Sequence, residues 1–261
     1  MKASGITMQK LDELGNQNWL RVNWLQPPLN NLKVRQAVLA ALSTQDVLDA
    51  QVGNPDYYTV TGALFVANTP LATEVGATQI KPPDIARAKQ LLKEGGYKGE
   101  SIVLMHPTDN ALVGAITPVV AQALRAIGMN VDMQSMDWQT LVSRRAKMDP
   151  VAQGGWHLFP TFFTDVDLLN PVSNPAVNTK GRNGGFLGWP EDAEIEKLRD
   201  DFAREPDAAK QKQIAEKIQA RVYEQVVFVA LGQNTLKAAY RDTLSGLVKG
   251  PVTVFWNIEK K

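Results

Sequence analysis

The 261-residue sequence contains no cysteine and only two histidines, His106 and His157. The absence of cysteine excludes disulfides, thiol catalysis and thiolate ligands for zinc. Neither histidine has a second histidine four residues further on, so no metal site is expected. The sequence also lacks a nucleophile elbow and a phosphate-binding glycine loop. We therefore expect a protein that is not an enzyme and that carries no cofactor.

An excess of charge of one sign and a long apolar run are also missing. Lys and Arg total 28 against 27 for Asp and Glu, and no basic stripe indicates a nucleic-acid partner. The longest apolar run, residues 226–231, is too short to cross a bilayer. No long apolar segment follows Met1 and Lys2, so this start is not a secretory signal. Either the protein is cytosolic or its targeting segment lies outside this sequence.

Hydrophobic periodicity predicts alternating strands and helices, which is typical of an α/β domain with parallel pairing. Asn31, Asp84 and Asp137 stand where N-caps are expected, and residues 53–83 and 160–190 are predicted to be rich in loops. Pro118 belongs either in the first turn of its helix or within a longer, kinked helix. The tail at 252–256 is β-prone. Strands are predicted at 19–25, 101–105, 129–136, 156–159 and 226–231, and helices at 33–42, 44–50, 85–94, up to 127, 137–147, 192–204 and 207–225.

Two neighbouring carboxylates are the main candidates for binding chemistry. Asp165 and Asp167 follow the aromatic pair Phe162 and Phe163, with Trp156 upstream. Aromatic faces supply apolar area and a carboxylate supplies one strong polar contact, so this mixture suits the wall of a ligand pocket. A helix-capping aspartate beside ordinary core aromatics explains the same residues equally well. The residues themselves leave both interpretations open.

Five segments, in order along nearly the whole chain, resemble the family 5 extracellular solute-binding proteins, the dipeptide-, oligopeptide- and nickel-binding branch of the ABC importers. Each segment alone is a weak signal, whereas five in order are specific. Arg35, within the first segment, is interpreted as a structural salt-bridge partner. The segments are 28–37, 84–97, 124–128 with Trp138 beyond the next strand, 155–167 with the loop 186–190, and the helix containing Ile218 and Glu224 that leads into 226–231.

The resemblance implies an α/β fold with a mixed sheet and flanking helices, the second lobe of a two-lobed periplasmic binding protein of the class II type. It assigns residues 1–22 to a remnant of the first lobe and a hinge strand, 23–230 to the second ligand-binding lobe, and 231–261 to a hinge and a return to the first lobe. The hinge strands are expected near 19–25 and 229–234. A binding cleft needs two walls, so weak or absent ligand binding is expected of this C-terminal lobe alone.

The function implied is capture of a peptide or similar small solute and delivery to an ABC permease in the membrane, by a monomer in the periplasm or outside the cell. Dipeptide binders of the family hold the ligand's amino group with an acidic residue that matches Asp165, or Asp167 with an offset. They also place a basic residue after the strand that is predicted to end at Met105. Here Thr108 and Asp109 stand at that place, which favours a longer peptide or another cationic or neutral solute over a free dipeptide.

Arg182 and Trp189, in a glycine-rich loop, are further candidates for the cleft. Two other functions remain open. The same fold could sense a ligand and signal to a partner, as in some transcription regulators. A hydrolase is the weakest alternative, because no nucleophile, base and orienting group are found together.

Overall fold

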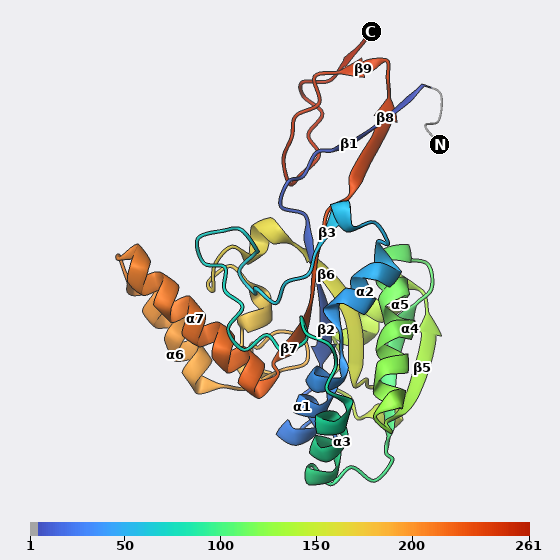
Figure 1. Cartoon of the computed structure of the whole chain (residues 1–261), viewed down its shortest axis with the longest axis vertical. Helices are drawn as coiled ribbons and strands as arrows, with labels where there is room; N and C mark the ends of the chain where they lie inside the picture. The colour runs from blue at the N-terminus through green and yellow to red at the C-terminus, as the bar shows by residue number, and fades with distance from the viewer. Residues whose placement is uncertain (1–4) are drawn as a thin grey trace.

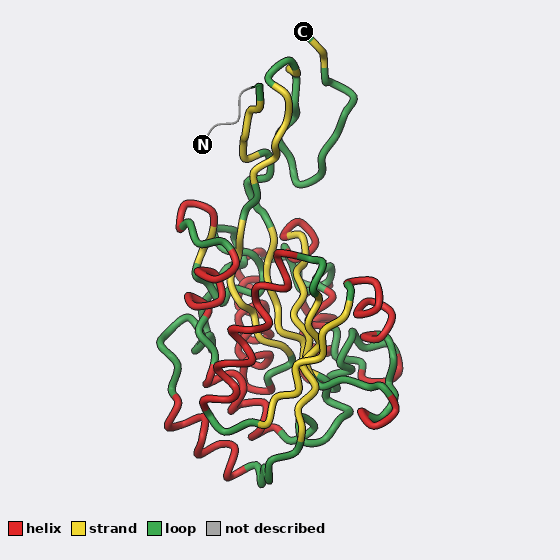
Figure 2. Tube along the Cα trace, turned by 90° about the vertical axis from the view of Figure 1, so that its right-hand side faces the viewer, coloured by secondary structure: helices red, strands yellow, loops and turns green. Residues whose placement is uncertain are grey.

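The computed structural model describes residues 5–261 as a broad body and a narrow arm (Figures 1 and 2). A six-stranded mixed sheet forms the centre of the body, with strand order β3-β7-β2-β6-β4-β5. Strand β2 is antiparallel to both of its neighbours, β6 and β7, whereas β4 runs parallel to β5 and β6. The strands of the sheet are β2 (Asn16–Val22), β3 (Tyr58–Thr59), β4 (Ser101–Pro107), β5 (Asn130–Met136), β6 (Leu158–Thr164) and β7 (Phe228–Asn234).

Helices cover the sheet, and the α6–α7 pair lies away from α4 and α5 (Figure 1). Successive side chains of β4 point to opposite faces of the sheet and so belong to two separate apolar clusters. Ile102 and Leu104 join the large cluster with α4, whereas Val103 and Met105 join a smaller one with α5. The helices are α1 (Leu32–Ala41), α2 (Thr44–Gln51), α3 (Ile85–Glu94), α4 (Ala111–Ala126), α5 (Trp138–Arg145), α6 (Ala193–Arg204) and α7 (Ala208–Gln225).

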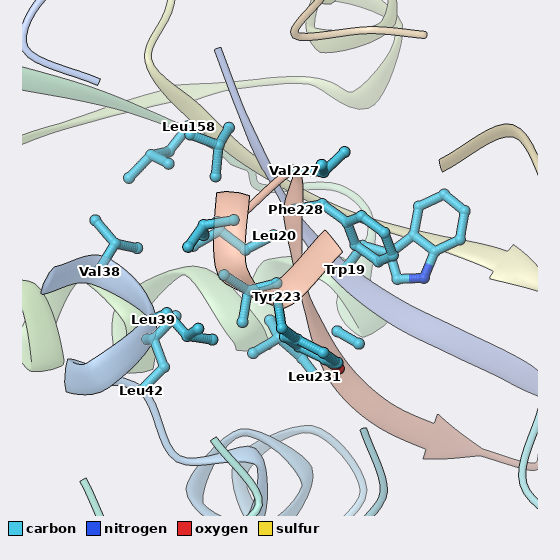
Figure 3. Packing of buried hydrophobic residues seen from close by; sticks show 14 of the residues in the cluster. Trp19, Leu20, Val38, Leu39, Leu42, Leu158, Tyr223, Val227, Phe228 and Leu231 are labelled. Carbon is cyan, nitrogen blue, oxygen red and sulfur yellow. The ribbon is translucent and has the colours of Figure 1, made fainter. Parts of the chain in front are cut away.

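The large cluster unites β2, near one end of the sequence, with β7, near the other. Every residue of β7 is buried, because this strand lies inside the sheet and is covered on both faces. Side chains of α1 and α7 pack on the same cluster (Figure 3). Labelled members are Trp19, Leu20, Val38, Leu39, Leu42, Leu158, Tyr223, Val227, Phe228 and Leu231.

The predicted N-caps are confirmed. The side chains of Asn31, Asp84 and Asp137 each accept a hydrogen bond from a backbone N–H in the first turn of the helix that follows. Helix α4 is the longer of the two options, with Asn110 as its cap and Pro118 inside it.

Within residues 5–261, Arg35 does not form the structural salt bridge that was predicted for it. It is buried, donates to backbone carbonyls including those of Leu29 and Gln225, and lies over the ring of Trp24 at 3.7 Å.

Two strand predictions are wrong in detail. The strand expected at 156–159 is β6, which runs from Leu158 to Thr164 because its second half pairs with the first half of β2. Phe162 and Phe163 therefore lie on a strand and not in a loop. The tail at 252–256 forms no strand, and Phe255 and Trp256 are largely exposed, since nothing in residues 5–261 covers them.

The arm is a ribbon of two antiparallel strands, β1 (Ile6–Lys10) and β8 (Lys237–Arg241), continued by the short pair β9 (Leu244–Ser245) and β10 (Glu259–Lys260). Residues 11–15 and 235–236 join this arm to the body (Figure 2), and we call these two segments the neck. Strand β2 begins directly after the first neck segment, and β7 ends directly before the second. The domain boundaries placed at residues 22 and 230 remain a prediction.

Candidate functional site

The end of the sheet that faces the neck carries a cluster of buried polar side chains. There β2 begins and β6 and β7 end, which brings together segments that are far apart in the sequence. Gln17 and Asn18 come from β2, Gln233 and Asn234 from β7, and Asp165 follows β6; all five are buried. Buried amides and carboxyls need hydrogen-bond partners, so each one fixes the position of its neighbours.

Asp165 lies at the centre of this cluster, at the start of a 3₁₀ turn (Asp165–Leu168), and has no exposed surface. Its backbone N–H donates to the carbonyl of Gly15 at 2.9 Å, and its Oδ2 accepts from the side-chain amide of Gln233. Its Oδ1 has no hydrogen-bond partner among residues 5–261. Burial raises the pKa of Asp165 to about 7; the bond from Gln233 opposes this rise, and the charge of Asp12 adds to it.

The orientation of the Gln233 amide is fixed from its other side. Its Oε1 accepts from the backbone N–H of Ala67 at 2.9 Å, so its Nε2 is directed toward Asp165. Gln17 is held in a similar way, donating to the carbonyl of Ala63 at 2.8 Å and accepting from the indole of Trp19 at 2.6 Å. The loop at 63–67 thus supports both glutamines.

Asn18, Gln51 and Asn234 form a second amide network. Asn18 and Gln51 exchange two hydrogen bonds, at 2.7 and 2.9 Å, and Asn234 donates to both of them. Gln51 also donates to the carbonyl of Leu112 in α4. Since Gln51 ends α2, the network ties α2 and α4 to the neck end of the sheet.

A cavity of about 200 Å³ lies between the neck and this end of the sheet. Gln233, the partner of Asp165, is part of its wall. The wall carries charges of both signs and two tyrosines, a surface suited to a polar ligand. Its lining residues are Lys10, Glu13, Leu14, Asp56, Tyr57, Tyr58, Thr59, Ala67, Asn68, Gln233, Asn234 and Thr235.

The predicted aromatic residues divide between two places. Phe163 is half-buried beside Asp165; it stacks on Trp19 with ring centroids 4.4 Å apart and meets the edge of Phe186 at 5.7 Å. Phe162 is also half-buried.

Trp156 and Trp189 belong instead to the smaller core cluster with Phe159, and their exposed fractions are 0% and 5%. They present almost no surface to a ligand in this structure, so the wall predicted to join Trp156 to Phe162 and Asp165 is not formed. Their part in binding stays a prediction.

The other predicted residues are exposed. Asp167 lies two residues after Asp165, within the same turn. Asp109 follows β4 at the same edge of the sheet and accepts from the backbone N–H of Trp138 at 2.7 Å, which caps α5.

Arg182 is not part of the neck cluster. Its guanidinium contacts the sulfur of Met148 at 3.8 Å. The backbone carbonyl of Met148 accepts from Gln26, which lies beyond the far end of β2. The structure therefore places Arg182 at the end of the sheet opposite Asp165.

The amides of the cluster were not among the predicted site residues. A signal for them exists in the sequence, because Asn16-Gln17-Asn18 and Gln233-Asn234 are runs of consecutive amides at one end of strands that are otherwise mostly apolar. Polar pairs at such positions mark the end of a buried strand where a hydrogen-bonding network is built. Register pairs Gln17 with Gln233 and Asn16 with Asn234, so the amide runs of the two strands lie side by side.

Two absences concern only the part of the chain that the structure describes. Residues 5–261 contain no helix with the length and apolarity that a bilayer crossing requires. The same residues contain no group of three or more acidic, histidine or cysteine side chains arranged to hold a metal ion.

Comparison with known families identifies the chain. The family model of bacterial extracellular solute-binding proteins, family 5 (middle), matches residues 2–176. The chain belongs to this family. A probable peptide ABC transporter periplasmic-binding protein of Sinorhizobium fredii is 35% identical over 256 residues, which are 98% of this chain and 48% of that protein. The chain thus spans about half the length of the curated relative, and the family predicted from the five segments is confirmed.

Solved structures agree on the fold. NikA from Staphylococcus aureus, in complex with Ni(L-His)2, superposes with a TM-score of 0.81 at 16% identity, covering 99% of this chain and 54% of that one. The oligopeptide-binding protein AppA from Bacillus subtilis, in complex with a nonapeptide, gives 0.80 at 18% identity, covering 96% and 51%. The predicted α/β fold, a mixed sheet flanked by helices as in periplasmic binding proteins, is confirmed.

Proposed function

We propose that this chain supplies one wall of the ligand site in the substrate-binding component of an ABC importer, which delivers a peptide or similar solute to a membrane permease. Membership of the family supports a binding role in place of catalysis. The name of the relative from S. fredii supports a peptide as the solute class and the periplasm, or the outer side of the membrane, as the location. The proposed protein acts as a monomer, without nucleic acid and without enzymatic activity.

The observation that carries the proposal is the state of Asp165. It is a buried carboxyl beside the neck, with one oxygen held by Gln233 and the other without a partner among residues 5–261. A carboxyl of this kind gains most from an approaching ammonium or other N–H donor, which supplies both a hydrogen bond and a compensating charge. The proposed ligand group at Asp165 is therefore cationic, as a peptide amino terminus is.

Access to Asp165 requires movement of the groups that cover it, since its carboxyl has no exposed surface. The half-buried ring of Phe163 lies two residues before Asp165 and offers apolar area for an adjacent side chain of the ligand. Asp167, exposed in the same turn, is the second acidic candidate.

The preference against a free dipeptide rests on Asp109. At the place where dipeptide binders carry a basic residue, this exposed carboxylate caps α5 and would repel a ligand carboxylate nearby. The proposed ligand is therefore a longer peptide, whose carboxylate lies elsewhere, or a cationic or neutral solute. Because the proposed site has its second wall elsewhere, this chain alone is expected to bind weakly or not at all.

Native mass spectrometry of the protein purified from its source tests the proposal by detecting a co-purified ligand. Calorimetry with peptides of two to nine residues, and with sugars and polyamines for comparison, then defines the solute class. Binding of peptides longer than two residues supports the proposal. Failure of all peptides with binding of sugars refutes the peptide assignment, and turnover of the bound solute would refute the binding role.

A further inference from the structure

The first neck segment lies directly against the end of β7 and the first residue of the second segment. Gly15 has a φ of +89°, and a Cβ at this position would lie 2.2 Å from the carbonyl oxygen of Asn234 and 2.8 Å from Cγ2 of Thr235. A contact this close excludes any side chain at position 15. A change in the spacing of the two segments is therefore transmitted at once from one to the other.

Asp165 is bonded to the first segment and to the strand that leads into the second. Its N–H donates to the carbonyl of Gly15 in the first segment, and its carboxyl accepts from Gln233, two residues before the second segment begins. Gln233 is anchored in turn by the N–H of Ala67 in the body. The turn after β6 thus ties the first segment to the body, whereas the second segment is held by the bond from the N–H of Thr235 to the carbonyl of Tyr57 at 2.8 Å.

We propose that Asp165 and Gln233 form a proton-linked clamp on the neck, closed while Asp165 is neutral and loosened when Asp165 ionises, so that the freedom of the arm depends on pH. The proposal concerns the chain without ligand and does not rest on the proposed function. Its basis is the geometry: one residue contacts both the first neck segment and the end of β7 from which the second segment continues, and one of its carboxyl oxygens is buried without a partner among residues 5–261.

Ionisation has two opposing effects at this site. It strengthens the bond from Gln233, since a hydrogen bond to a charged acceptor is stronger. It also places a charge in a buried position opposite Asp12, which lies in the neck and is the charged group acting on Asp165 within the described chain. Burial dominates, because the pKa of Asp165 is raised to about 7 and not lowered. Above that pH the charge is relieved only if the neck segment moves and admits water.

The absence of cysteine allows a direct test, because two spin labels can be attached at introduced cysteines without background. Ala239→Cys in β8 and Lys89→Cys in α3 are exposed positions on the arm and the body. We expect the distance distribution from double electron–electron resonance to be narrow near pH 5.5 and at least about twice as wide near pH 8.5. Asp165→Asn should keep it narrow at both pH values. Asp167→Asn, the matched control two residues away and exposed, should behave as the wild type.

A wild-type distribution that is equally wide at both pH values would overturn the clamp, and so would an Asp165→Asn variant that widens as the wild type does. If Asp165→Asn fails to fold, Asp12→Asn provides the second test. The asparagine keeps the acceptor used by the backbone N–H of Leu14 but removes the charge that faces Asp165. In Asp12→Asn a larger fraction of Asp165 must be ionised before the distance distribution widens, and the widening should be at most about half of that in the wild type. Unchanged widening would also overturn the proposal.

Discussion

The side-chain amide of Gln233 donates to the buried carboxyl of Asp165, and this bond joins the last residues of β7 to the turn after β6. The two residues are 68 positions apart in the sequence and meet across β2. The contact links the candidate site, the neck and the pH response of the molecule, so several predictions depend on it.

Asp165→Asn should change how stability depends on pH. Because the folded-state pKa is raised from 3.8 to about 7, the carboxyl contributes its full stability below pH 4, and this contribution is lost as the pH rises to 7. A shift of this size corresponds to at most about 4 kcal/mol. Urea unfolding at pH 4.5 and pH 8 should show the loss in the wild type and in the exposed control Asp167→Asn, but not in Asp165→Asn. Equal pH dependence in Asp165→Asn and the wild type would contradict the account.

His157 should oppose this trend at acid pH. Its Nδ1 accepts from the N–H of Val103 at 2.9 Å, so Nε2 carries the proton and lies 2.8 Å from the carbonyl of Pro27. Burial lowers the pKa of His157, although the Pro27 carbonyl acts in the other direction. The stability from neutral His157 is therefore present above the unfolded-state pKa near 6.5 and is lost as the pH falls through the lower folded-state pKa.

Nitrogen NMR of the two imidazoles tests this assignment of the proton. We expect the Nε2–H tautomer for His157 at pH 7 and a titration midpoint below 6.5. His106→Gln removes the other histidine and should leave the His157 signals unchanged. A midpoint above 6.5, or the Nδ1–H tautomer, would show that the contact with Val103 is wrong.

Gly15→Ala should be costly because the new Cβ has no room. We expect a loss of about 2–4 kcal/mol in the free energy of unfolding, from the left-handed backbone and from collision with Asn234. Gly128→Ala is the matched control: its φ is +96°, but nothing lies within 4 Å of the Cβ, so only the backbone strain of about 1 kcal/mol applies. Equal losses in the two variants would contradict the close approach at the neck.

Arg21→Lys should loosen the loop between β6 and α6. Arg21 is fully buried in β2, donates two bonds to the carbonyl of Leu187 and one to that of Ala176, and burial lowers its pKa to about 9. Lysine cannot reproduce the planar fork, so we expect a loss of about 2–4 kcal/mol and faster proteolysis within 176–187. The control variant Arg182→Lys, at an exposed position in the same loop, should be cleaved at the wild-type rate. Unchanged cleavage in Arg21→Lys would show that the loop is held by other contacts.

The sequence predicted the parts of this molecule that depend on local signals. Caps at Asn31, Asp84 and Asp137 and the helix stripes follow from the chemistry of neighbouring residues, and they agree with the structure. The burial of Asp165 was not predictable in the same way, because it depends on Gln233 and Gly15, which pairing along β2 brings close. Trp156 shows the same limit. The sequence pattern of an aromatic residue beside a candidate pocket is the same whether its side chain faces a ligand or the core, and the side chain of Trp156 enters the core.

Calorimetry of the protein purified from its source tests the central claim, that the carboxyl of Asp165 receives the cationic group of the ligand. The probes are a tripeptide with a free amino terminus and the same peptide with that terminus acetylated. We expect acetylation to weaken binding by about 10- to 100-fold in the wild type and in Asp167→Asn, and to make little difference in Asp165→Asn, where the free peptide already binds weakly. Tight binding of the acetylated peptide to the wild type, or unchanged binding of the free peptide by Asp165→Asn, would contradict the claim.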